Sequence, residues 1–206
     1  CTMIQKICIE NRGNVSHFIY IPNFLSPLEI FFYQVWIYLC VDFLPVFTYN
    51  SIVIRYQKWY HKKMSYFNEN WPIFDRWKAS KYPVFLYFIE KKISGVVEKI
   101  TNTKININSC LINKYSQKNH RLYYHRDSAD VFGLCPTITS VTIGNSASIH
   151  IRRVGNSIDN DDFVLRLESG SLFIMSGFSQ VHYHHAIKMN DGGVRYSMVF
   201  REHNKS

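Results

Sequence analysis

The sequence predicts an α+β fold, in which a double-stranded β-helix (jelly roll) forms the core and two N-terminal helices pack against it. Eight short runs rich in β-branched and aromatic residues follow residue 104, and turn signals separate them. Two longer segments with helical features precede residue 104. With 206 residues and 47% hydrophobic content, the chain has the size and composition of one domain with a substantial core.

A short strand at residues 18–22 and then a helix are predicted at the start of the chain. Ser26 suits the N-cap of this helix, Pro27 its first position, and Glu29 the other half of a capping box. The helix should run to Cys40 or Val41, before a proline ends it. The apolar run 30–47 is interrupted by Gln34, Asp42 and Pro45, which favours a buried amphipathic helix over a membrane span.

Residues 48–57 are β-branched and aromatic, which predicts a strand. The following segment, residues 58–67, interleaves aromatic side chains with lysines. Such a mixture can stack nucleobases while its cations follow phosphates, and it is equally typical of an edge hairpin with half-buried aromatics. A second helix should begin at Pro83 and end near Ile100, because its apolar residues recur at three- and four-residue spacings.

Eight short strands are predicted in the second half, and their number and spacing indicate a sandwich or jelly roll. Turn signals such as Gly144-Asn145, Gly155-Asn156 and Ser169-Gly170 lie between them. The predicted strands are 105–113, 121–125, 137–143, 147–153, 163–167, 171–175, 181–187 and 194–201.

The net charge and the cysteines narrow the range of possible partners and cellular compartments. A net charge of +9 suits a polyanionic partner such as nucleic acid, although an ordinary basic surface is the alternative because the positive residues are spread along the chain. The five cysteines are odd in number and include no Cys-x-x-Cys, which argues against a disulfide framework and a structural zinc site. We therefore expect an intracellular protein of the cytoplasm or nucleus, without a membrane partner and monomeric.

The residues with the most chemical information lie in the last eighty positions. His125 and Asp127 are two apart, and the cluster 182–185 contains three further histidines. Two histidines and one carboxylate are the ligands of an iron site with open coordination positions. Arg195 and Arg201 stand six apart on one predicted strand, so they should share a face and could hold a dicarboxylate.

These motifs, in this order and spacing, resemble the AlkB-like iron(II)- and 2-oxoglutarate-dependent dioxygenases. The similarity is strong over about residues 105–202, and residues 18–104 match only in outline. The matching segments are Asn113-Lys114-Tyr115, His125-Arg126-Asp127, Pro136–Ser140 ahead of Val141–Gly144, Gly170–Gly177, His185-Ala186-Ile187 and Arg195–Arg201.

The resemblance implies a cofactor set of Fe(II), 2-oxoglutarate and O2. By the resemblance, His125, Asp127 and a later histidine would bind the iron. Arg195 would pair with the distal carboxylate of 2-oxoglutarate, together with Tyr115. Arg201 and Asn113 would serve the end of the cosubstrate that chelates iron, and Ser197 would add a polar contact.

The third iron ligand is open between His184 and His185. In a strand, His182 and His184 share one face and His185 lies on the other. We favour His185, because it precedes Ala-Ile as the family's ligand precedes a small and an aliphatic residue, and because it lies eight residues beyond Gly177.

For the substrate, the resemblance implies oxidative demethylation of N-alkylated nucleobases in DNA or RNA, with release of formaldehyde, succinate and CO2. A flipped or single-stranded base would be held between flat side chains. Ala129 departs from the family, because members acting on alkylated DNA bases often carry an acidic residue there. The candidate substrate contacts are Trp59, Tyr60, Tyr66 and Trp71 for stacking, and Arg126, Ser128 and Asp130 near the metal.

The resemblance also sets the expected organisation and the alternatives. Residues 1–104 would be an N-terminal extension with helices and a nucleotide-recognition lid, part of the same domain, and residues 105–206 would be the catalytic double-stranded β-helix. One alternative function is a 2-oxoglutarate oxygenase that hydroxylates or demethylates a protein or small molecule. Another is an inactive β-helix module that binds RNA.

Overall fold

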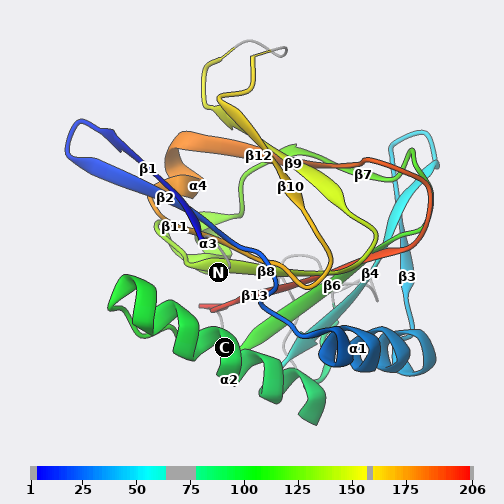
Figure 1. Ribbon diagram of the computed structural model, residues 1–206. Coiled ribbons are helices and arrows are strands. Elements are labelled where there is room, and N and C mark those ends of the chain that lie inside the picture. The colour runs from blue at the N-terminus through cyan, green and yellow to red at the C-terminus, as the bar shows by residue number, and fades with distance from the viewer. Residues whose placement is uncertain (1–3, 64–77, 157–159, 205–206) are drawn as a thin grey trace.

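The computed structural model describes residues 4–63, 78–156 and 160–204. Two β-sheets stack face to face, and the two long helices lie beneath the larger sheet, on the side away from the smaller one (Figure 1). All strand pairings in the described residues are antiparallel except that of one two-residue strand. The prediction of a mostly antiparallel, jelly-roll-like fold with few helices is therefore confirmed.

The larger sheet has nine strands within the described residues, in the order β1-β2-β11-β8-β13-β6-β4-β3, with β5 pairing parallel to β4. Its strands are β1 (Gln5–Asn11), β2 (Asn14–Ile21), β3 (Leu44–Phe47), β4 (Val53–His61), β5 (Ser80–Lys81), β6 (Ser109–Tyr115), β8 (Ile138–Gly144), β11 (Leu172–Gly177) and β13 (Arg195–Arg201). Strands from both halves of the chain thus form one continuous sheet.

The smaller sheet has four strands and covers the inner face of the larger one. In spatial order they are β10 (Phe163–Leu167), β9 (Ala147–Arg153), β12 (Tyr183–Met189) and β7 (Arg121–His125). Alternate residues such as Ile149, Ile151 and Ile187 point inward and pack with Phe18 and Phe173 of the larger sheet. The short helix α3 (Ala129–Phe132) lines this inner space with Val131 and Phe132, and the short helix α4 (Ser179–His182) lies against β2 and β11.

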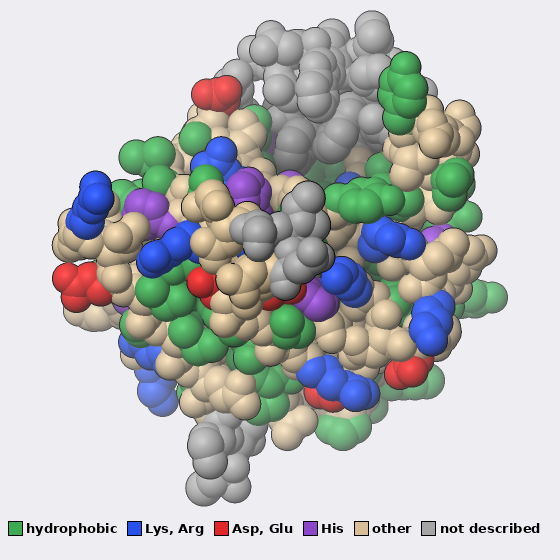
Figure 2. Space-filling model, turned by 90° about the horizontal axis from the view of Figure 1, so that it is seen from above, with side chains coloured by type: hydrophobic (Ala, Val, Ile, Leu, Met, Phe, Trp, Pro, Cys, Tyr) green, Lys and Arg blue, Asp and Glu red, His purple; other side chains and the backbone are tan. Residues whose placement is uncertain are grey.

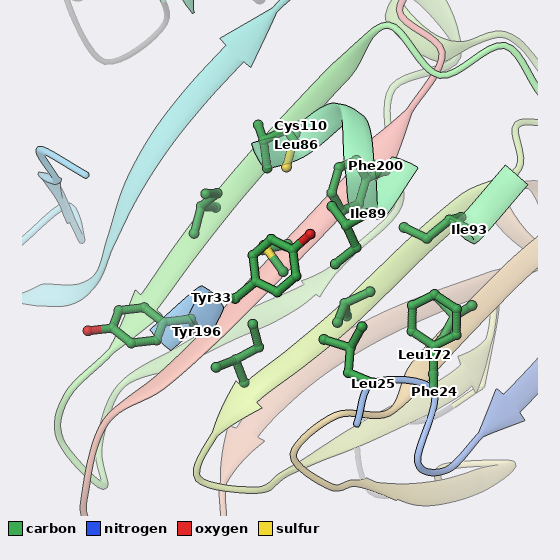
Figure 3. Packing of buried hydrophobic residues seen from close by; sticks show 14 of the residues in the cluster. Phe24, Leu25, Tyr33, Leu86, Ile89, Ile93, Cys110, Leu172, Tyr196 and Phe200 are labelled. Atoms are coloured by element: carbon green, nitrogen blue, oxygen red, sulfur yellow. The ribbon is translucent and has the colours of Figure 1, made fainter. Parts of the chain in front are cut away.

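The helices α1 (Pro27–Cys40) and α2 (Val84–Thr101) pack on the outer face of the larger sheet. At the start of α1, the Ser26 hydroxyl accepts from the Glu29 amide at 3.3 Å and the Glu29 carboxylate accepts from the Ser26 amide at 2.7 Å, which completes a capping box. Figure 3 shows side chains of both helices, including Tyr33 and Ile89, packed against strand residues such as Phe200. The larger sheet therefore packs against a hydrophobic core on each of its two faces.

The expectation that α1 is an amphipathic helix was wrong. The helix buries Tyr33, Trp36 and Ile37, but its outward side is apolar as well, with Leu28 and Tyr38 each 76% exposed. An amphipathic helix has an apolar face opposite a polar face, and α1 lacks the polar face. Within the described ranges, no helix is both long enough and apolar enough to cross a membrane.

Several predicted strand boundaries differ from the structure. Residues 105–108 precede β6 rather than belonging to it, and residues 179–182 form α4, so β12 begins at Tyr183. The strand predicted at residues 18–22 corresponds to the second half of β2, whereas β1 and its hairpin pairing with β2 were not predicted. Its turn places Arg12 and Gly13 at positive φ, as tight hairpin turns require.

Candidate iron and 2-oxoglutarate site

A cavity of about 530 Å³ lies between the two sheets. This volume is within the range of about 300–1,000 Å³ that is typical of small-molecule sites. Much of the lining is apolar, and its polar residues come from β4, β6, β8, β12 and β13, from the end of β7 and from the residues that follow β7. The polar residues that line it are Arg55, Gln57, Asn113, Tyr115, His125, Arg126, Asp127, Ser128, Ser140, His185, Ser197 and Arg201.

Three of the predicted iron ligands meet at one end of this cavity. His125 ends β7 and lies opposite His185 of β12 in the antiparallel register, and Asp127 follows two residues later. One potential ligand atom from each of these residues lies within 4.8 Å of the others. The His125 Nδ1 donates to the Tyr123 carbonyl at 2.9 Å, which turns Nε2 toward the Asp127 carboxylate, 3.6 Å away.

The electrostatics of these three side chains suit a divalent cation. Burial lowers the pKa of His185 to about 3 and lowers that of His125 as well, so both imidazoles are neutral at neutral pH and keep a lone pair for a metal. Burial alone would raise the pKa of Asp127, but the charge of Arg201 and its hydrogen bond to the carboxylate oppose this, and that pKa lies below its ordinary value.

Two neighbours hold the Asp127 carboxylate in place. Arg201 Nη1 donates to Asp127 Oδ2 at 2.5 Å, and the Asp127 amide donates to the Gln180 side-chain oxygen at 3.0 Å. Such outer contacts fix the orientation of a ligand and therefore contribute to metal affinity. Gln180 comes from α4, the short helix that the sequence did not predict.

The residues predicted to hold the cosubstrate lie on β13 and β6. Arg195 is completely buried, its guanidinium donates to the Thr142 hydroxyl at 3.0 Å, and the centre of the Tyr115 ring is 5.2 Å from its central carbon. Its Nε and Nη1 have no hydrogen-bond partner among the described residues. Buried charged donors require partners, so a carboxylate at this position would fit them.

Ser197 and Asn113 lie side by side in the register between Arg195 and the metal end. Ser197 is hydrogen-bonded to Ser140 at 2.9 Å, and Asn113 accepts from Arg55 Nε at 3.1 Å. The alternation of β13 therefore brings Arg195, Ser197 and Arg201 to one face, as the six-residue spacing of the arginines predicts.

The predicted substrate residues are more scattered. Arg126 lines the cavity and donates to the Val181 carbonyl at 3.3 Å, and Ser128 lines it too. Asp130 is exposed on α3 and is not among the lining residues.

Trp59 is only 1% exposed and packs with Ala79 and Leu111, so its burial does not fit a role in stacking a base. Tyr60 is also buried, in the core between the helices and the larger sheet. The candidates Tyr66 and Trp71 lie outside the described residues.

The sequence reasoning missed Arg55 and Gln57, which line the cavity from β4, and Gln180. The available signal was their alternation within the predicted strand 48–57, which places Arg55 and Gln57 on one face. No motif marked that face as the inner one.

His184 and His185 can be separated by mutation. His184 pairs with Arg152 of β9 and is half-buried on the other face of β12, whereas His185 is in the three-residue cluster. We expect His185→Ala to lower affinity for Mn(II), used as a redox-stable substitute for iron, by at least about 100-fold, because it removes a direct ligand. His184→Ala should bind within about three-fold of the unmodified protein, which lies inside the scatter of surface substitutions.

Titration calorimetry with Mn(II) on both variants provides the measurement, with circular dichroism to verify folding. Normal affinity of His185→Ala together with lost affinity of His184→Ala would reverse the assignment.

Comparisons with known proteins agree with this geometry. The family model described as 2OG-Fe(II) oxygenase superfamily matches residues 44–201. Among curated proteins, alpha-ketoglutarate-dependent dioxygenase alkB homolog 3 from Bos taurus is 29% identical over 108 residues, which is 48% of this chain and 38% of the relative. The same protein from Homo sapiens is 28% identical over 108 residues, with the same coverage of both chains. The matches therefore span little more than a third of these relatives.

Solved structures share the fold. The structure titled "The structure of OsALKBH1" superimposes with a TM-score of 0.70 at 14% identity, covering 96% of this chain and all of the other. An oxidoreductase of the 2OG-Fe(II) oxygenase family from Burkholderia pseudomallei gives a TM-score of 0.61 at 12% identity, covering 89% of this chain and 84% of the other. At these identities the likeness shows the fold alone.

Proposed function

The chain belongs to the 2OG-Fe(II) oxygenase superfamily, whose cofactors are Fe(II), 2-oxoglutarate and O2, and on this basis we propose that it oxidatively demethylates N-alkylated nucleobases in DNA or RNA. The observation that carries the proposal is the meeting of two features in one cavity. One is the cluster of His125, Asp127 and His185, and the other is the set of predicted cosubstrate residues Asn113, Tyr115, Ser197 and Arg201, with the buried Arg195 beside Tyr115.

When bound, Fe(II), 2-oxoglutarate and O2 supply the oxidation of a C–H bond: one oxygen atom enters the substrate's methyl group and the other enters succinate, with loss of CO2. A hydroxymethyl group on a base nitrogen then leaves as formaldehyde and restores the base. This last step requires no general base from the protein.

The residues of the chain would bind the metal, orient the cosubstrate and shield the reacting atoms from water. His125, Asp127 and His185 would hold the metal from three sides and leave its remaining positions open. Arg195 would pair with the distal carboxylate of the cosubstrate, with Tyr115 beside it, while Asn113, Ser197 and Arg201 would contact the remainder. The apolar side of the cavity, including Ile149, Leu167 and Phe173, would exclude water from the reacting atoms.

The charge of the chain supports nucleic acid as the substrate. Figure 2 looks onto the outer face of the smaller sheet and shows Lys, Arg and His side chains spread across it. On this sheet, Lys188 of β12 pairs with Arg121 of β7, and both side chains are exposed. Together with the net charge of +9, these cations favour a polyanion on the outer face of this sheet.

We also propose the organisation that goes with this function. Residues 105–206 would carry the catalytic β-helix, and residues 1–104 would extend the same domain and contribute a lid over the base. The protein would act as an intracellular monomer. Flat side chains for stacking would come from the segment 64–77, which includes Tyr66 and Trp71 and lies outside the described residues.

The test is an assay with Fe(II), 2-oxoglutarate and ascorbate, with and without a single-stranded oligonucleotide that contains N1-methyladenine. We expect formaldehyde and succinate in equal amounts, and formaldehyde only when the methylated oligonucleotide is present. Succinate without turnover of the oligonucleotide would instead favour a protein or small-molecule substrate. Absence of both products would favour an inactive module that binds RNA.

A further inference from the structure

The cavity wall formed by β4 contains a polar group that the proposed chemistry does not use. Gln57 is 1% exposed and lines the cavity. Neither its side-chain oxygen nor its side-chain nitrogen has a hydrogen-bond partner among the described residues. Burying an amide without partners is unfavourable, so this arrangement indicates a ligand with complementary groups.

The neighbours of Gln57 show which part of the cavity it serves. In the register, Gln57 lies beside Asn113 of β6, which in turn lies beside Ser197 of β13. The residues proposed to hold the cosubstrate are on β13 and β6, so Gln57 is one strand further from Arg195. It therefore faces the part of the cavity beside the cosubstrate residues.

Arg55 connects this wall to the metal end. It shares the inward face of β4 with Gln57, and its Nε donates to Asn113 Oδ1 at 3.1 Å. Strand β4 also contacts β7, which ends at His125. The β4 wall thus lines the same cavity as the cosubstrate residues and the metal ligands.

We propose that the Gln57 amide is a specificity-determining contact that reads the edge of the substrate base and favours methylated adenine over methylated cytosine. This inference rests on the proposed demethylase function. A glutamine amide presents a donor and an acceptor side by side, which matches the N7 acceptor and the N6 amino donor of adenine. Methylation at N1 leaves both of these groups available.

Methylated cytosine can form a hydrogen bond with the oxygen of the Gln57 amide but not with its nitrogen. In 3-methylcytosine the accessible edge beside the methyl group offers the N4 amino donor and a C5–H, so the amide nitrogen of Gln57 would stay unpaired. Leaving one buried polar atom unpaired is expected to weaken binding by about ten-fold. The structure therefore predicts a preference between the two bases that the charge of the chain cannot provide.

The experiment compares the unmodified protein with Gln57→Leu and Gln57→Glu, and with Gln117→Leu as a control on an exposed loop. Affinities are measured by fluorescence anisotropy with Mn(II) and 2-oxoglutarate present. The probes are single-stranded oligonucleotides that carry 1-methyladenine, 3-methylcytosine or no methyl group. Turnover of the two methylated oligonucleotides and the KM for 2-oxoglutarate are measured on the same proteins with iron.

We expect Gln57→Leu to lower affinity and kcat/KM for the 1-methyladenine oligonucleotide by about ten-fold, and those for 3-methylcytosine by much less. Gln57→Glu should also weaken the adenine substrate, because it replaces the amide donor by an acceptor. The KM for 2-oxoglutarate should not change, and Gln117→Leu should match the unmodified protein.

A thermal melt separates recognition from a structural role. Without ligands, Gln57→Leu should melt at the same or a higher temperature, because it replaces an unpaired polar group by an apolar one of similar size. A lower melting temperature together with equal losses on both oligonucleotides would overturn the proposal, as would a raised KM for 2-oxoglutarate. If the unmodified protein neither binds nor demethylates any oligonucleotide, the proposed function fails and this inference fails with it.

Discussion

Asp127→Ala is expected to abolish metal binding and turnover together. The carboxylate is the only anionic member of the cluster with His125 and His185, so its removal leaves two neutral imidazoles. Removing even an outer contact of a metal ligand can lower affinity by about 10- to 100-fold, and loss of a ligand itself should exceed that. His125→Ala should have the same effect for the same reason.

Calorimetric titration with Mn(II) and the formaldehyde assay measure the two consequences separately. Asp127→Asn is the informative partner variant, because it keeps the shape and an oxygen for Arg201 but loses the negative charge. We expect it to fold normally and still to bind Mn(II) at least about ten-fold more weakly. Asp191→Ala, in an exposed turn, is the matched control. Retained turnover in Asp127→Ala or His125→Ala would remove the basis for the iron site.

Much of the fold was predictable because short β-branched runs, separated by turn signals, mark the strands of the second half. In β13, inward residues such as Arg195 and Arg201 alternate with Tyr196 and Phe200, which pack beneath the sheet. The alternation, the turn signals and the spacing of the arginines all point to the same arrangement. Agreement between these signals made the sheet and the shared face of the arginines accessible from sequence alone.

The wall formed by β4 could not be predicted in the same way, because no motif marks which face of this strand is the inner one. Tyr60 packs on the helix side, while Gln57 and Trp59 face the other way, and all three are less than 9% exposed. Without a polar face, the period of two does not tell which residues point inward. Trp59 therefore suggested an open stacking surface, although it is in a core cluster.

The sequence also could not decide whether His184 or His185 faces the cavity. Neighbouring residues of a strand point to opposite faces, so the sequence shows that only one of them can face the cavity. Which one does so depends on the register of β12 against β7, where His185 lies opposite His125. A register is a long-range property, set by contacts between segments about sixty residues apart.

Arg195→Met is expected to remove 2-oxoglutarate binding while leaving the metal ligands intact. Arg195 is completely buried, and its Nε and Nη1 have no partner among the described residues, so a carboxylate is the natural counter-charge. Truncating one partner of a buried, hydrogen-bonded charge pair costs roughly 2–5 kcal/mol, which predicts an affinity for 2-oxoglutarate at least about 30-fold lower. Affinity for Mn(II) alone should be unchanged.

Although Arg195→Met should weaken 2-oxoglutarate binding, it should not lower the thermal stability of the ligand-free protein. Burial lowers the pKa of Arg195, and the neighbouring Tyr115 opposes this shift. Among the described residues, no carboxylate forms a salt bridge with Arg195. Methionine of similar length removes that charge, so Arg195→Met should unfold at the same or a higher temperature than the unmodified protein. A purely structural arginine would produce a clear loss of stability instead.

Thermal melts with and without 2-oxoglutarate combine both expectations in one measurement. At about a hundred times its Kd, a ligand stabilises the folded state by about 2.7 kcal/mol. That increment should be present in the unmodified protein and in Arg166→Met, a control on the exposed side of β10, and absent from Arg195→Met. An undiminished ligand-induced shift in Arg195→Met would place the dicarboxylate elsewhere in the cavity. It would leave the two buried nitrogens without the partner that their environment demands.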